Sequence, residues 1–233
     1  MLITENAILR PSGSTLIQAI YKRCADATQQ VRLMAEAPTV FAPVLACGTG
    51  GYAMPVLQPL RNAKDVSAAL TLLADYWNTK GTVRTAGCCT RIEYQQYVAQ
   101  LPADGFLLKI AARLYRATRY KRGTPAASLH GDATLAHAML YNDIPRWIDP
   151  NPRCVPLEAE VDCGKLLQSV FGYDHCVPEV AEIVDKFMRA RKVNMLLTQY
   201  YFSTHLVRLW RYQPQHRAWA LGVAREIFRG GAA

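Results

Sequence analysis

Apolar side chains recur every three or four residues over most of this chain, which is the spacing of an amphipathic helix. The first such run covers residues 16–36, with Ser14 as a cap at its start and Pro38 at its end. Seven further helices are predicted over residues 64–78, 90–101, 106–120, 157–171, 178–187, 196–210 and 215–228. The pattern therefore predicts a mainly helical chain, and it contains no internal repeat.

Two stretches of the sequence favour strands instead of helices. Residues 40–47 and 52–57 are apolar runs on either side of a turn that contains Gly48, Gly50 and Gly51. A second, smaller hairpin is predicted over residues 138–148, with turn chemistry at Asn142-Asp143. A short helix capped by Asp132 is the alternative there.

Composition excludes several classes of protein. The chain has 233 residues, of which 51% are hydrophobic and 19% charged, so it can bury a core and is not disordered. Its seven cysteines are an odd number, and the first 20 residues lack the apolar core of a signal peptide. The longest apolar-rich segment, residues 40–60, is interrupted by glycines and prolines. We therefore expect a cytoplasmic protein with free thiols and no membrane span.

The formal net charge is +9, and part of it is concentrated in one predicted helix. Residues 109–122 contain six basic side chains and no acidic one. Such a run is either a solvated helix face or a surface that contacts nucleic acid or an acidic protein.

Candidate chemistry gathers between residues 130 and 150. His130-Gly131-Asp132 is followed by His137 and then by Ile148-Asp149-Pro150. Phosphoryl transfer needs one carboxylate to accept or orient the substrate hydroxyl and another to hold Mg²⁺ against the phosphates. Because the predicted hairpin lies between Asp132 and Asp149, it returns the second aspartate to the first. We therefore expect both carboxylates in one cleft.

Three segments in this order resemble the aminoglycoside phosphotransferase and choline kinase family, which is related in fold to protein kinases. They are Leu129-His130-Gly131-Asp132-Ala133-Thr134-Leu135, Trp147-Ile148-Asp149-Pro150 and Val161-Asp162-Cys163-Gly164-Lys165-Leu166-Leu167. The resemblance implies an α+β, protein kinase-like fold. Residues 1–59 would form a reduced, β-containing amino-terminal lobe, and residues 60–233 a larger, mainly helical carboxy-terminal lobe. It also implies an ATP- and Mg²⁺-dependent phosphotransferase that acts on a hydroxyl of a small molecule.

The resemblance assigns roles to individual residues. Asp132 would be the catalytic base, with His130 helping to order the catalytic loop. Asp149 would bind Mg²⁺, and His137 occupies the position of the second metal ligand. Asp162 would hydrogen-bond the backbone of the catalytic loop as a structural support.

The same resemblance places the nucleotide on the inner strand and hinge at residues 52–58. There the backbone of Met54, Val56 and Gln58 would meet the adenine of ATP.

The sequence departs from the family in two respects. The family has an Asn five residues after the catalytic Asp, where this chain has His137, and Mg²⁺ prefers oxygen ligands. No Gly-rich loop and no V-A-I-K motif occur in residues 1–13, where Arg10 is the cation that could replace the strand lysine. Two alternatives follow: a truncated or degenerate member that binds a nucleotide or a protein partner without catalysis, or a basic interaction subunit.

Overall fold

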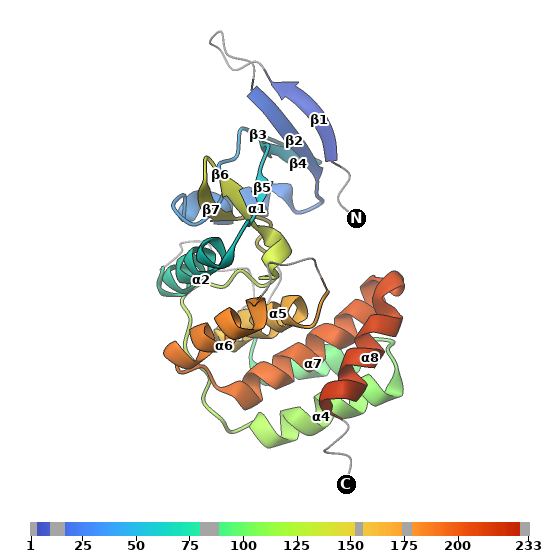
Figure 1. Cartoon of the computed structure of the whole chain (residues 1–233). Coiled ribbons are helices and arrows are strands. Elements are labelled where there is room, and N and C mark those ends of the chain that lie inside the picture. The colour runs from blue at the N-terminus through green and yellow to red at the C-terminus, as the bar shows by residue number, and fades with distance from the viewer. Residues whose placement is uncertain (1–3, 10–16, 80–88, 152–155, 174–178, 229–233) are drawn as a thin grey trace.

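The computed structural model describes residues 4–9, 17–79, 89–151, 156–173 and 179–228. Strands gather at the amino-terminal end of the molecule and helices at the other end (Figure 1). A small second sheet lies between the first sheet and the helices (Figure 1).

The first sheet is antiparallel throughout and has the strand order β1-β2-β4-β3. Its elements, with the helix that follows β2, are β1 (Thr4–Leu9), β2 (Ile17–Arg23), α1 (Ala27–Glu36), β3 (Ala46–Gly48) and β4 (Gly51–Pro55). The predicted hairpin around the glycine turn is thus confirmed from residue 46 onwards. Its first strand is shorter than predicted, because Val40 and Ala42 instead exchange backbone hydrogen bonds with Trp147.

The helix predicted over residues 16–36 is wrong in its first half. Residues 17–23 form β2, which pairs with β1 on one side and with β4 on the other. The helix itself starts only at Ala27, after a turn at residues 25–26. Pairing on both edges outweighs the helical spacing of the apolar residues, and Ile17, Ile20 and Tyr21 are themselves residue types that favour strands.

The second sheet contains the other predicted hairpin. Its strands are β5 (Gln58–Pro59), β6 (Ala138–Tyr141) and β7 (Ile144–Trp147). Asn142 and Asp143 both have positive φ, 50° and 60°, as a tight two-residue hairpin turn requires. The hairpin is therefore confirmed over its alternative, and the segment after Asp132 contains only the 3-10 helix η1 (Leu135–His137).

The remaining predicted helices are all present, with ends that differ by a few residues. They are α2 (Ala63–Asn78), α3 (Arg91–Ala99), α4 (Gly105–Thr118), α5 (Glu160–Val170), α6 (Val180–Ala190), α7 (Met195–Tyr212) and α8 (Arg217–Phe228), with the 3-10 helix η2 (Pro214–His216) before the last. Thr90 and Glu93 form the predicted capping box of α3. No helix in the described ranges is long and apolar enough to cross a membrane.

Helices α5 and α7 form the centre of the helical part. Gly164 on α5 faces α7 so closely that a Cβ atom there would lie 2.7 Å from the backbone nitrogen of Phe202 and 3.0 Å from the carbonyl carbon of Tyr201. Since backbone atoms cannot move aside as a flexible side chain can, only glycine fits at this crossing.

We expect Gly164→Val to lower the free energy of unfolding by about 1–3 kcal/mol, because it forces extra carbon atoms into a filled interface. Urea denaturation of the purified protein measures this loss. Gly222→Ala on α8 is the matched control, since no atom outside the adjacent backbone lies within 4 Å of its Cβ position. That control should be neutral or stabilising by up to about 1 kcal/mol. Equal stability of Gly164→Val and the native protein would contradict the close packing of α5 and α7.

Candidate active site

The loop before Asp132 is fixed by the buried carboxylate of Asp162, which lies in the first turn of α5. This carboxylate accepts hydrogen bonds from the indole N–H of Trp77 at 2.9 Å and from the backbone N–H groups of His130 and Gly131 at 3.0 and 2.7 Å. Burial raises the pKa of Asp162 to about 6, although these three hydrogen bonds act in the opposite direction. The structural support expected of Asp162 is confirmed.

His130 connects this loop to the strand that leads to Asp149. The imidazole is fully buried; its Nε2 atom donates to the carbonyl oxygen of Ile148 at 2.8 Å, and its Nδ1 atom accepts from the N–H of Asp132 at 3.3 Å. Burial, and then the neighbouring His137, lower the pKa of His130 to about 3. A neutral ring with both nitrogens occupied suits the ordering role expected of His130.

Asp132 and Asp149 line one cavity of about 290 Å³, as the hairpin argument predicts. The cavity is lined by Lys22, Asp26, Gln30, Asp132, His137, Asp149, Asn151, Arg208 and Tyr212. Its walls therefore come from β2 and α1 on one side, from the segments around the second sheet in the middle, and from α7 on the other side.

The carboxylate of Asp132 is one-third exposed and forms an ion pair with Lys165 at 2.6 Å. Burial by itself would raise the pKa of Asp132, but Lys165 and His137 outweigh it and hold the pKa well below its ordinary value. The side chain is therefore an ionised carboxylate that faces the cavity. His137 also fixes the segment between Asp132 and itself, because the Nδ1 atom of His137 lies 2.7 Å from the carbonyl oxygen of Asp132.

Asp149 is almost completely buried and has a positive φ of 60°. Its Oδ1 atom accepts a hydrogen bond from the hydroxyl of Tyr52 and forms an ion pair with Lys22. Burial, together with Asp149, raises the pKa of Tyr52, so the phenol keeps its proton and donates. Both contacts use the same carboxylate oxygen.

Lys22 is a candidate site residue that the sequence pattern does not predict. It lies on β2, in a segment whose apolar spacing predicts a helix, and it places a cation beside Asp149, a position for which Arg10 is the candidate in the sequence. Arg10 lies outside the described residues. The apolar run Ala19-Ile20-Tyr21 directly before the lysine is a strand signal that could have located it.

The donor set at the cavity suits a metal ion that is shared with phosphate groups. Nowhere in the described ranges do three His, Cys, Asp or Glu side chains come together as a protein-only metal site. Mg²⁺ is usually bound through one or two carboxylates, with phosphate oxygens and water as its other ligands. Asp149, with the amide of Asn151 on the same wall, provides hard oxygen ligands of this kind. The residues therefore fit Mg²⁺ when a nucleotide supplies the phosphates.

The three residues predicted to meet adenine lie at the connection between the two sheets. Met54 is buried on β4, Val56 is 45% exposed, and Gln58 begins β5 and pairs with Leu140. They are not among the residues that line the cavity of the two aspartates.

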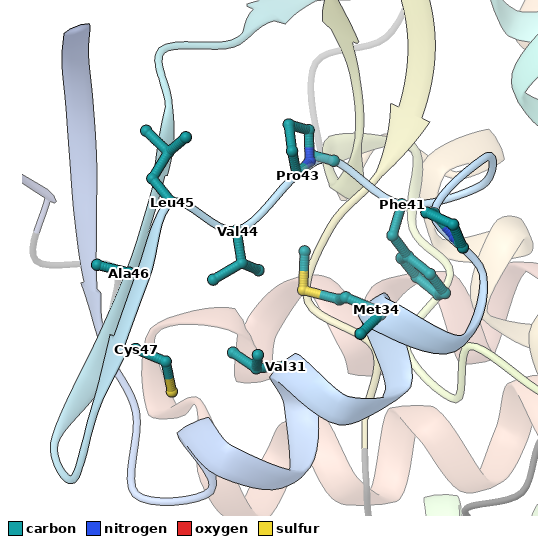
Figure 2. Close-up of a pocket in the computed structure, with 11 residues that line it drawn as sticks. Val31, Met34, Phe41, Pro43, Val44, Leu45, Ala46 and Cys47 are labelled. Carbon is teal, nitrogen blue, oxygen red and sulfur yellow. The ribbon is translucent and has the colours of Figure 1, made fainter. Parts of the chain in front are cut away.

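A second cavity, of about 400 Å³, lies between α1 and the segment that leads into β3 (Figure 2). Val31 and Met34 of α1 line one side of it and Pro43, Val44 and Leu45 the other, with the side chain of Val44 pointing toward Val31 (Figure 2). It is the larger of the two cavities, but its lining is apolar and contains none of the predicted site residues. Asp132, His137 and Asp149 line the smaller, charged cavity instead.

No protein-family model and no curated protein matches this sequence. Solved structures do match it. An amicoumacin kinase in complex with AMP-PNP, Ca²⁺ and Ami has a TM-score of 0.61 at 9% identity, over 97% of this chain and 88% of that one. The chain has a protein kinase-like fold.

Two further structures agree with this assignment. The ethanolamine kinase of Plasmodium vivax has a TM-score of 0.57 at 10% identity, and the match covers 94% of this chain and 79% of that one. An aminoglycoside phosphotransferase from Streptomyces rimosus, in complex with ADP and streptomycin, has a TM-score of 0.55 at 12% identity, and the match covers 88% of this chain and 92% of that one. At these identities the likeness concerns the fold, and it confirms the kinase-like fold class that residues 129–170 implied.

We expect His130 to remain neutral, with its proton on Nε2, throughout the range from pH 5 to pH 8. Its pKa in the folded protein is about 3, against 6.5 for an ordinary histidine. Protons therefore bind the unfolded chain preferentially, and this residue's contribution to stability falls as the pH drops from about 6.5 toward 3. Nitrogen-15 NMR of the imidazoles measures the titration, with His130→Gln to assign the signal and the urea-unfolded protein as reference. A midpoint above pH 5 in the folded protein would show that the ring is not buried in this way.

Proposed function

We propose that this protein is an ATP- and Mg²⁺-dependent phosphotransferase that acts on a hydroxyl group of a small molecule. One observation carries the proposal: Asp132 and Asp149 line the same cavity, and Lys22 on β2 contacts Asp149. A base, a metal-binding carboxylate and a cation for phosphate oxygens are the parts that phosphoryl transfer requires. The kinase-like fold is consistent with this arrangement.

Asp132 is the proposed catalytic base. Its low pKa means that the carboxylate is ionised and can accept or orient the proton of the attacking hydroxyl. Its neighbours hold it in place, since Lys165 contacts the carboxylate and His130 accepts from its backbone N–H. The hydroxyl oxygen is thereby directed toward the phosphoryl group while its proton faces Asp132.

Asp149 and Lys22 form the proposed phosphate side of the site. Mg²⁺, when bound with ATP, supplies charge neutralisation at the transferred phosphoryl group. In this chain, Asp149 would hold the metal through its second carboxylate oxygen, and Lys22 would contact phosphate oxygens. His137 remains the residue at the second ligand position, and the backbone of Met54, Val56 and Gln58 remains the proposed adenine contact.

A non-catalytic nucleotide-binding protein is the second candidate. The observation that favours it is the ion pair between Lys165 and Asp132, which occupies the proposed base. Turnover is the measurement that separates the two candidates, because both predict nucleotide binding. The basic run on α4 provides no comparable arrangement of side chains for an interaction subunit.

A cytoplasmic location is part of the proposal. The described cysteines Cys24, Cys47 and Cys163 are free thiols, which suits a reducing compartment.

Asp132→Asn should reduce ATP consumption in the presence of a hydroxyl-bearing acceptor by about 10²- to 10⁴-fold, the usual contribution of a general base. A coupled assay of ADP release across a panel of acceptors measures the rate, and far-UV circular dichroism checks that the fold persists. The matched control is Asp75→Asn on the exposed face of α2, which should retain full activity. Undiminished turnover by Asp132→Asn would remove Asp132 from the chemistry.

Mg²⁺ with the non-hydrolysable nucleotide AMP-PNP should stabilise the protein by about 2.7 kcal/mol at a concentration 100 times its Kd. Lys22→Met should lose most of this stabilisation, because the cation that faces the phosphates is gone. The comparison is made within each variant, with and without nucleotide, so that any effect on folding cancels. Lys186→Met, on the exposed surface of α6, should respond like the native protein. A full response by Lys22→Met would place the phosphates elsewhere.

A further inference from the structure

The α7 wall of the cavity is cationic, and the mechanism above does not use it. Arg208 and Tyr212, both on α7, line the cavity beyond Asp132. Lys165, on the neighbouring helix α5, contacts Asp132 from the same helical part of the molecule. Two positive charges therefore lie close to the proposed base, on the side opposite Lys22.

The carboxylates that face each other in the cavity already have cationic partners. Lys22 pairs with Asp149, and Lys165 pairs with Asp132. Arg208 has no such partner, because no carboxylate in the described ranges lies within 4.0 Å of its guanidinium group. The guanidinium group is instead hydrogen-bonded to Tyr94. Its Nε atom is buried without a hydrogen-bonding partner among the described residues. A buried N–H group without an acceptor costs free energy, so an acceptor brought by a ligand or by water would stabilise this side of the guanidinium group.

Other buried polar atoms on α5 and α7 also lack partners in the described part of the chain, among them the Nδ1 atom of His205, which is an acceptor because Nε2 donates to the carbonyl oxygen of Val161. The amide nitrogen of Gln168 is a second buried donor without a partner in the described part of the chain, and the Oε1 atom of the same side chain is 3.1 Å from Lys165. His205, one turn before Arg208 on α7, is fully buried. Burial, followed by the charges of Lys165 and Arg208, holds the pKa of His205 well below its usual value. The potential in this corner is therefore positive, and the imidazole stays neutral.

We propose that the acceptor substrate carries an anionic group, a carboxylate or a phosphate, which Arg208 binds while the substrate hydroxyl faces Asp132. This inference rests on the proposed phosphotransferase function, and it defines the substrate class of that site. Lys165 supports the anion through its charge and holds Asp132 in place. A cationic acceptor would instead meet Arg208 and Lys165 at close range and be repelled by both.

The neighbours of Arg208 assign this residue to the acceptor substrate and not to the nucleotide. Arg208 lines the same cavity as Asp132 and interacts with it electrostatically, whereas Lys22 and Tyr52 contact Asp149. The nucleotide phosphates are expected beside Asp149, which Lys22 of β2 contacts, whereas Arg208 reaches the cavity from α7. The hydroxyl groups of Tyr212 and Tyr97 are hydrogen-bonded to each other at 3.0 Å, so Tyr212 adds a polar aromatic side chain to this wall.

The test uses four probes titrated into the full chain by calorimetry, with and without saturating Mg²⁺ and AMP-PNP. Glycerate, glycerol and serinol are three-carbon alcohols that are anionic, neutral and cationic, and inorganic phosphate is the second anion. Arg208→Gln removes the positive charge, and Arg208→Lys keeps it. The control is Arg116→Gln on the exposed face of α4, which changes the net charge by the same amount as Arg208→Gln. The same three alcohols are assayed as acceptors with Mg²⁺ and ATP.

We expect glycerate or phosphate to bind about 10- to 100-fold more tightly than glycerol or serinol, both to the native protein and to Arg116→Gln. This ratio of dissociation constants corresponds to the free energy of a charge-assisted hydrogen bond. Arg208→Gln should lose this preference without a change in AMP-PNP affinity, and Arg208→Lys should retain part of it. The tighter of the two anions identifies the group as a carboxylate or a phosphate. In turnover, the loss in Arg208→Gln should appear in KM for the anionic acceptor.

Three results would overturn the inference: no anion binds, serinol or glycerol binds as well as the anions, or Arg208→Gln weakens AMP-PNP as much as it weakens the anion. Failure of the proposed function looks different. In that case no acceptor supports ATP consumption, while anion binding still depends on Arg208, and the pocket is an anion site of a protein that is not a phosphotransferase.

Discussion

The buried carboxylate of Asp162 holds together three parts of the molecule that are distant in sequence. Asp162 lies on α5, and its carboxylate accepts hydrogen bonds from the indole N–H of Trp77 at the end of α2 and from the backbone N–H groups of His130 and Gly131 in the loop before Asp132. A carboxylate in this position is tolerated only because three donors compensate for its lost hydration. Any movement of the loop would leave a buried charge unsatisfied, so the backbone of Asp132 is confined to one position. The geometry of the cavity depends on this constraint.

Much of the fold is encoded in short segments and could be predicted from them. The capping box of Thr90 and Glu93 and the turn at Asn142-Asp143 act over two to four residues, so the sequence shows them directly. The hairpin then determines where Asp149 returns, which is why two aspartates seventeen positions apart could be placed in one cavity. The fold class followed from the residues around this hairpin.

What could not be predicted depends on contacts between distant segments. Residues 17–23 have the apolar spacing of a helix, and their pairing with β1 and β4 outweighs that spacing and makes them a strand. Lys22 was missed for this reason, since its role requires that β2 stand opposite Asp149. The pairing of Lys165 with Asp132 was equally hidden, because it needs α5 to pack beside the loop. Local spacing carries no information about either contact.

His137 stands where the family that the sequence resembles has Asn, and its contacts explain what the imidazole does there. An imidazole is a poor ligand for Mg²⁺, and the Nδ1 atom of His137 is turned toward the carbonyl oxygen of Asp132. The ring also stacks on His130 with centroids 6.0 Å apart, so it packs against the loop that Asp162 holds. We infer that His137 reinforces the position of the base, and that the protein's contribution to metal binding is centred on Asp149. Such a site depends more heavily on the nucleotide phosphates for its remaining metal ligands, so metal and nucleotide would bind to this chain together.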